Sequence, residues 1–293
     1  MRRGRRGMKR REFLKIGLSF ATALSLSGIL GKRAMGLEVK PTTKEFYGIL
    51  VDTTRCIGCR TCELACAESH GLPAPDVEDR TVFKSIRKTN DKRLTVVNRF
   101  SVDGREIYVK SQCMHCNQPA CVAACLVKAM KKRQEGPVTW DENCMGCRYC
   151  MVSCPFDMPK FEYDEAFGRI MKCDMCYSRI AIGKVPACVE ACPQEALTFG
   201  KRRDILNEAK RRIYTDTGRY VPYIYGEHEV GGTSYVYISS VTFEKIGFKT
   251  DVGYRPYPEF TTGFLYSVPI ILVLWPAFLT GIHHLTKEHR KGE

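Results

Sequence analysis

The sixteen cysteines of this 293-residue chain carry its most specific chemical signal. They form four groups of four with none left over: Cys56-x2-Cys59-x2-Cys62-x3-Cys66, Cys113-x2-Cys116-x4-Cys121-x3-Cys125, Cys144-x2-Cys147-x2-Cys150-x3-Cys154 and Cys173-x2-Cys176-x11-Cys188-x3-Cys192. Groups one and three have the spacing with which a tight loop places three thiolates on one [4Fe–4S] cluster and a fourth on another. The sequence therefore predicts four [4Fe–4S] clusters, with all sixteen thiolates binding iron.

Each group needs a partner, because its fourth cysteine starts a helical turn and points away from its own loop. Only 18 residues separate groups two and three, so these two pair easily, and group one must then find group four across the intervening chain. The predicted ligand sets are crossed: Cys56, Cys59 and Cys62 with Cys192; Cys173, Cys176 and Cys188 with Cys66; Cys113, Cys116 and Cys121 with Cys154; Cys144, Cys147 and Cys150 with Cys125.

Three alternatives compete with the clusters. Zinc sites use C-x2-C pairs but need neither the third cysteine two residues later nor the fourth after three more. Disulfides are expected outside the cell, but cysteines two apart in tight loops make poor bridges. Sixteen cysteines in four such groups also exceed what chance would place there, so iron–sulfur chemistry is favoured.

Other residues offer little further chemistry. Gly58 and Gly146 fall between ligands, where a side chain would obstruct backbone N–H groups that turn toward sulfur. His70, His115 and His228 are candidate ligands; His115, between two cysteines, either lies behind a cluster or faces solvent. No acid/base pair, nucleophile or phosphate loop is present, so we predict no catalytic residue in this chain.

The remaining pattern indicates an α+β fold. A strand is predicted at 45–51, and Asp103-Gly104 predicts a hairpin of 95–102 with 105–110. A second turn at Glu135-Gly136 precedes a strand at 138–140, and a helix at 203–213 buries Leu206, Ala209 and Ile213. A strand follows at 234–241. We expect two interlaced ferredoxin-like modules over 45–200 and a C-terminal extension over 201–260.

The N-terminus predicts an export signal over 1–36. Arg10-Arg11-x-Phe13-Leu14-Lys15 resembles the twin-arginine signal, with Lys9 where Ser or Thr is usual, and an apolar stretch follows. A route that carries folded proteins would let clusters be built in the reducing cytosol. The alternative is a basic N-terminus before a core helix.

Residues 264–282 form a run without charges, about 28 Å long as a helix and close to the thickness of a bilayer's hydrocarbon core. The basic tail, 283–293, is predicted to lie in the cytoplasm and the clusters on the periplasmic side of the membrane. A buried core helix is the alternative. The formal charge of +14 lies mostly at the two ends of the chain, so no nucleic-acid partner is expected.

The whole chain resembles the four-cluster ferredoxin-type subunits of membrane-bound respiratory oxidoreductases. The segments 112–116, 146–152, 197–200, 222–227 and 231–233, the signal and the C-terminal helix are closest to the iron–sulfur subunits of periplasmic uptake [NiFe]-hydrogenases of the hydrogenase-2 type. Formate dehydrogenase β subunits are similar too but typically lack their own signal. One departure is Leu126, where the family usually has proline after the cysteine, which puts the local turn in question.

The resemblance implies electron transfer from a catalytic partner subunit, expected to be a [NiFe]-hydrogenase, to a quinone-reactive integral membrane subunit. The alternatives are a β subunit of formate dehydrogenase or a related molybdopterin oxidoreductase, and a structural or assembly protein whose clusters only hold the fold.

Overall fold

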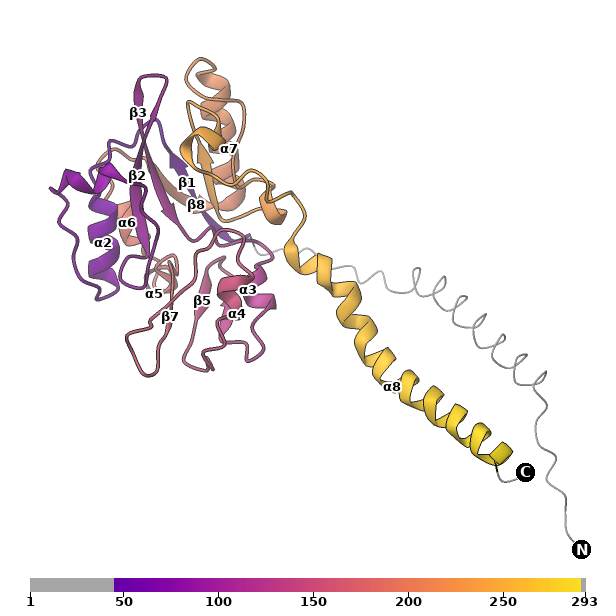
Figure 1. The fold of residues 1–293 in the computed structure, drawn as a ribbon. Helices are drawn as coiled ribbons and strands as arrows, with labels where there is room; N and C mark the ends of the chain where they lie inside the picture. Colours follow the sequence, from indigo (N-terminus) through magenta and orange to yellow (C-terminus); the bar gives the residue numbers. More distant parts are fainter. Residues whose placement is uncertain (1–44, 291–293) are drawn as a thin grey trace, which may run out of the picture. The chain divides into compact units, whose positions relative to one another are not determined.

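A three-stranded sheet joins the two ends of the cysteine-bearing segment in the computed structural model, which describes residues 45–290 (Figure 1). Its central strand β1 (Tyr47–Asp52) is antiparallel to β8 (Leu197–Lys201) and parallel to β9 (Tyr235–Ile238). The predicted strands at 45–51 and 234–241 are confirmed within one to three residues at each end. The signal predicted for 1–36 and the last three residues of the tail lie outside the described residues.

The central sheet is buried on both faces, as expected for a run of apolar residues that does not alternate. On one face, Leu50 packs in a cluster with Ile205, Ala209 and Ile213 of helix α7 (Arg202–Thr215). On the other face, Ile49 lies in a second cluster that includes several of the cysteines. The helix predicted at 203–213 is confirmed, with Ile205 more deeply buried than Leu206.

The longest ladder is the hairpin of β2 (Thr95–Val102) and β3 (Arg105–Gln112). Its turn residues Asp103 and Gly104 both have positive φ, 51° and 74°, which is the backbone that a two-residue turn needs to match the twist of its strands. The predicted hairpin is confirmed, and β3 continues two residues further, up to Cys113.

Short elements lie within and between the four cysteine groups. They are α2 (Thr61–Ser69), η1 (Arg80–Lys84), α3 (Ala120–Ala123), β4 (Met130–Lys132), β5 (Val138–Trp140), α4 (Tyr149–Val152), β6 (Lys160–Phe161), β7 (Ile170–Met171), α5 (Tyr177–Ala181) and α6 (Ala187–Glu190). Helix α2 contacts α6, and α3 contacts α4. Group one therefore meets group four, and group two meets group three.

The chain after α7 returns to the sheet. It passes through η2 (Glu229–Gly231), adds β9 beside β1 and then forms η3 (Phe243–Ile246). Tyr225, Tyr235 and Tyr237 are almost fully buried and pack with Phe243 and neighbouring rings, so the tyrosine-rich segment serves the core.

The final helix, α8 (Tyr257–Arg290), contains the predicted apolar run and is longer at both ends. Its apolar part, Tyr257–His284, has a mean hydropathy of 1.9 and is long and apolar enough to cross a membrane. None of its most apolar window is buried, so the alternative of a buried core helix is wrong for the described chain.

The buried carboxylate of Asp52 ties β1 to α7 and offers a test of the fold. It accepts hydrogen bonds from Tyr220 Oη at 2.9 Å and Arg212 Nη1 at 3.1 Å. Asp52→Asn removes one of the two carboxylate charges that pair with the buried Arg212 guanidinium, the other being that of Glu208, so we expect a loss of about 3 kcal/mol. Thermal unfolding followed by circular dichroism should shift down by roughly 10 °C.

The matched control is Glu106→Gln. Glu106 forms an ion pair with Arg99 at 2.9 Å, in which both side chains are exposed. Its loss should change stability by less than about 1 kcal/mol. Equal shifts in the two variants would contradict a structural role for the Asp52 carboxylate.

Candidate iron–sulfur sites

Four cysteines from groups one and four line one hollow in the protein. Cys56, Cys59 and Cys62 come from the loop before α2 and its first turn, and Cys192 follows α6. The remaining wall is largely apolar and includes Val51, Ile57, Val97, Ala196 and Leu197. Four sulfur donors around an apolar hollow suit a cubane of iron and sulfide, whose corners each need one thiolate.

A second hollow is lined by Cys125 of group two and by Cys144, Cys147 and Cys150 of group three. Its apolar wall is built by Val127, Met130, Trp140, Met145 and Ile170. Cys147 is exposed, whereas Cys150 is buried. This site therefore lies nearer the protein surface than the first.

The other eight thiols also meet across groups. Burial raises the pKa of Cys116 well above its usual value, and the thiols of Cys113, Cys154 and Cys121 add to that rise. Burial likewise raises the pKa of Cys66, with further contributions from Cys173, Cys188 and Cys176. Thiols of groups two and three therefore lie near one another, as do thiols of groups one and four, and the crossed ligand sets stay a prediction.

Burial disfavours the thiolate form of several of these cysteines in the absence of a bound cation. Burial raises the pKa of Cys56 to about 11, that of Cys150 to about 11 and that of Cys121 to about 12. Iron is bound by the thiolate form, and a positive metal favours deprotonation. Grouped buried thiols therefore fit metal ions as their charge partners.

The residue before the second cysteine of each group adopts the left-handed backbone. Gly58, His115, Gly146 and Met175 have φ of 68°, 50°, 72° and 60°. This conformation turns the backbone N–H groups of Gly146 and Met175 toward the sulfurs of Cys144 and Cys173, both at 3.4 Å. Glycine was expected to mark these turns, but two of the four use residues for which this backbone is uncommon.

The turn after Cys125 keeps the geometry of its counterparts although Leu126 replaces proline. Lys128 has φ of 54° and donates its N–H to the Cys125 carbonyl at 3.1 Å. Asp157, three residues after Cys154, has φ of 53° and makes the same bond at 3.2 Å. The departure at Leu126 therefore does not change the turn, and its side chain is exposed.

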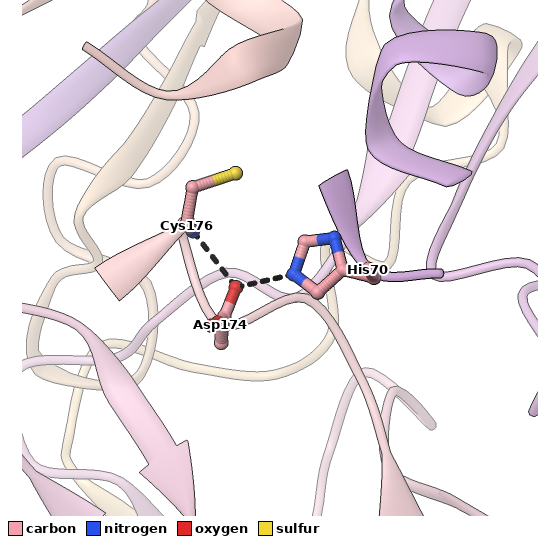
Figure 2. Close-up of side chains that lie close together, drawn as sticks. All are labelled: His70, Asp174 and Cys176. Atoms are coloured by element: carbon pink, nitrogen blue, oxygen red, sulfur yellow. Dashed lines mark hydrogen bonds and ion pairs between the residues drawn. The ribbon is translucent and has the colours of Figure 1, made fainter. Parts of the chain in front are cut away.

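His70, Asp174 and Cys176 lie close together beside the fourth cysteine group (Figure 2). His70 Nε2 lies 2.8 Å from Asp174 Oδ1, which also accepts the Cys176 N–H at 2.8 Å. His70 Nδ1 faces the Cys66 carbonyl at 2.8 Å, so both ring nitrogens have oxygen partners.

The hydrogen bonds of His70 favour its charged form. Burial alone lowers the pKa of His70, but Asp174 and the Cys66 carbonyl raise it above the usual value. Because both ring nitrogens face oxygen acceptors, neither presents a free lone pair to a metal. His70 instead ties the end of α2 to the loop that carries Cys173 and Cys176.

The other two candidate histidines have different surroundings. His115 is fully buried and its Nδ1 accepts the Val138 N–H at 2.8 Å, so the expectation that it faces solvent is wrong. Burial lowers the pKa of His115 well below its usual value, as do the charges of Lys172 and Lys132. His228 is mostly exposed and lies beside Glu227 and Tyr254.

Comparison with known proteins places these sites in context. Residues 105–202 match a family model described as a 4Fe-4S dicluster domain. A protein of Nitratidesulfovibrio vulgaris is 46% identical over 97% of this chain and 78% of its own. The hydrogenase-2 operon protein HybA of Escherichia coli O157:H7 is 32% identical, over 82% of this chain and 83% of its own.

Two further relatives belong to other enzyme complexes. The B subunit of the anaerobic dimethyl sulfoxide reductase of Escherichia coli K12 is 43% identical over 53% of this chain and 73% of its own. The iron–sulfur subunit of formate dehydrogenase-O from the same strain also matches, at 32% identity over 69% of this chain and 71% of its own. The similarity therefore covers iron–sulfur subunits from several complexes.

Gly58 and Gly146 give a matched test of the turns that hold the ligands. A β-carbon on Gly58 would lie 2.3 Å from the Tyr108 ring, whereas the nearest atom to one on Gly146 is 3.8 Å away. Both substitutions to alanine strain a left-handed residue by roughly 1–2 kcal/mol, but only Gly58→Ala also displaces a packed ring.

We expect Gly58→Ala to lose the iron bound by Cys56, Cys59, Cys62 and Cys192, about a quarter of the total. Gly146→Ala should keep its iron. Iron and acid-labile sulfide, measured on anaerobically prepared protein, check this difference. Equal iron content in the two variants would contradict it.

Proposed function

The chain belongs to the iron–sulfur electron-transfer subunits of respiratory oxidoreductases, and we propose that it relays electrons through four [4Fe–4S] clusters from a periplasmic catalytic subunit to a quinone-reactive membrane subunit. The observation that carries the proposal is the meeting of thiols from groups one and four, and from groups two and three, around shared hollows.

The clusters would supply one-electron transfer with little rearrangement, and the protein would supply their ligands and surroundings. The ligand sets we propose are the four crossed ones predicted from the spacing. Helix α2 carries Cys62 and Cys66 one turn apart. Cys188 on α6 and Cys192, two residues after the end of α6, have the same spacing. Because α2 contacts α6, these helices would hold two clusters as neighbours.

A membrane partner is supported by α8. A single exposed apolar helix at the C-terminal end suits an anchor beside an integral subunit. Lys287 follows the apolar part, and a basic flank favours the cytoplasmic side, which leaves the cysteine-bearing part in the periplasm. The twin-arginine-type signal would bring the folded chain there.

The catalytic partner we propose is a [NiFe]-hydrogenase. HybA matches this chain along most of both lengths, whereas the match to the dimethyl sulfoxide reductase subunit covers about half of this chain. A formate dehydrogenase or another molybdopterin oxidoreductase is the second candidate, supported by the match to the formate dehydrogenase-O subunit. A structural or assembly role is the third.

Iron content and paired substitutions test the crossed ligand sets. The parent should contain about sixteen iron per chain. Cys66→Ala and Cys173→Ala, alone or combined, should each lose the same cluster and leave about twelve. Cys56→Ala combined with Cys66→Ala should leave about eight, because these two thiols serve different clusters.

Two results would contradict the ligand sets. If the unsubstituted protein contains stoichiometric zinc, or only about eight iron atoms per chain, it does not hold four clusters. A Cys56→Ala/Cys66→Ala variant with no less iron than Cys66→Ala alone places both thiols on one cluster.

Activity of the intact complex tests the relay. The complex is purified anaerobically from membranes through a tag on this subunit and assayed with hydrogen or formate as donor. We expect hydrogen to reduce a quinone analogue. In the Cys66→Ala complex this activity should be lost, while hydrogen still reduces a viologen dye that accepts electrons at the catalytic subunit.

The outcomes separate the three candidates. Reduction of the quinone analogue by formate alone identifies a formate dehydrogenase. Unchanged quinone reduction in a Cys66→Ala complex that has lost a cluster shows that this cluster is not in the electron path and favours a structural role.

A further inference from the structure

Lys110, on β3, is buried in the interior with 3% of its surface exposed. Lysine is almost never fully buried unless its charge is paired. Its Nζ donates to Thr95 Oγ1 at 2.8 Å and to Gln112 Oε1 at 2.9 Å, both neutral oxygens. Among residues 45–290 it forms no ion pair with a carboxylate, so its charge has no protein carboxylate as partner there.

Further hydrogen bonds fix the orientation of the Gln112 side chain, which accepts from the Lys110 ammonium group. Gln112 Nε2 donates to Tyr237 Oη at 2.6 Å, which leaves the amide oxygen facing Lys110. Tyr237 Oη in turn donates to the Lys110 carbonyl at 3.0 Å. An ammonium has three donors, and the described residues supply acceptors for two of them.

Lys110 lies near cysteines of two ligand sets: its Nζ is 5.7 Å from the centre of the Tyr235 ring, whose hydroxyl is 3.9 Å from Cys173 Sγ. Lys110 lines the hollow of Cys56, Cys59, Cys62 and Cys192. Burial lowers the pKa of Lys110, but the thiols of Cys188, Cys62 and Cys173 raise it above its usual value. Cys62 belongs to one proposed ligand set, and Cys173 and Cys188 belong to the other.

We propose that Lys110 is the shared counter-ion of the two clusters ligated by groups one and four, and that its charge raises the reduction potential of both. The inference rests on the proposed four clusters. A cluster with four thiolates is anionic and gains one further negative charge on reduction. A fixed cation in a buried, weakly polarisable environment therefore stabilises the reduced form more than the oxidised form.

The location of Lys110 limits its effect on reduction potential to two of the four proposed cluster sites. The hollow of Cys125, Cys144, Cys147 and Cys150 does not include Lys110 in its wall. Cys116, which shares a proposed ligand set with Cys113, Cys121 and Cys154, has Lys132 as its neighbouring cation. Two of the four potentials should therefore respond to Lys110 and two should not.

The test is a redox titration of the intact complex, followed by electron paramagnetic resonance, in the parent and in Lys110→Met. Methionine keeps the length and removes the charge. We expect two of the four couples to become harder to reduce by at least about tenfold, which is about 59 mV for one electron. The other two couples should stay where they are. Lys245→Met, which removes an exposed lysine paired with Asp103, should move none.

A second variant covers the case in which Lys110→Met does not assemble. Gln112→Glu keeps the lysine and places a carboxylate beside it, so the added negative charge should lower the same two potentials. Iron content is measured in every sample, and a parent with fewer than four clusters contradicts the proposed function, not the inference alone. A fully loaded Lys110→Met with unchanged potentials, or with all four shifted equally, overturns the role of Lys110. If only Gln112→Glu assembles, then unchanged potentials in that variant, or an equal shift of all four, overturn the role of Lys110.

Discussion

The structure depends on one geometric constraint: a short loop can offer only three of its four thiols to the same cubane. The fourth lies one helical turn further on, as Cys66 does after Cys62 on α2. Each group of cysteines is therefore incomplete until another group arrives beside it. The contacts of α2 with α6 and of α3 with α4 satisfy this need twice. The central sheet then fixes the first pair, because β1 leads into group one and β8 follows group four.

Spacing made the pairing of cysteine groups predictable, because cysteine is rare and its separations within each group are regular. The strand periodicity and the Asp103-Gly104 turn were also readable, since each depends on local backbone preferences. The spans of the paired strands could be anticipated, but not that β9 would lie parallel to β1. That pairing joins segments far apart in sequence, and no local pattern encodes it.

Several features of the sites gave no sequence signal. Lys110 stands in a strand of mixed polarity, where a lysine ordinarily faces solvent. The left-handed residues His115 and Met175 occupy turns that glycine would mark, so their backbone could not be read from residue type. The link between His70 and Asp174 spans 104 residues of sequence. All of these are set by tertiary packing, which holds unfavourable charge and backbone conformations in place.

The order of strands in the central sheet governs how the chain can be made. β1 is the first strand of the described chain to leave the ribosome, yet its partners β8 and β9 are about 150 and 190 residues away. Such non-local pairing is slow to form, because a long loop must close, at a cost in entropy, before contacts between the strands can stabilise it. In the proposed ligand sets, the partners of the first four thiols are complete only once Cys192 has been made. With the crossed ligand sets proposed above, the two clusters at that end of the protein need Cys188 and Cys192, whereas the two clusters of groups two and three need no residue beyond Cys154 and can be completed earlier.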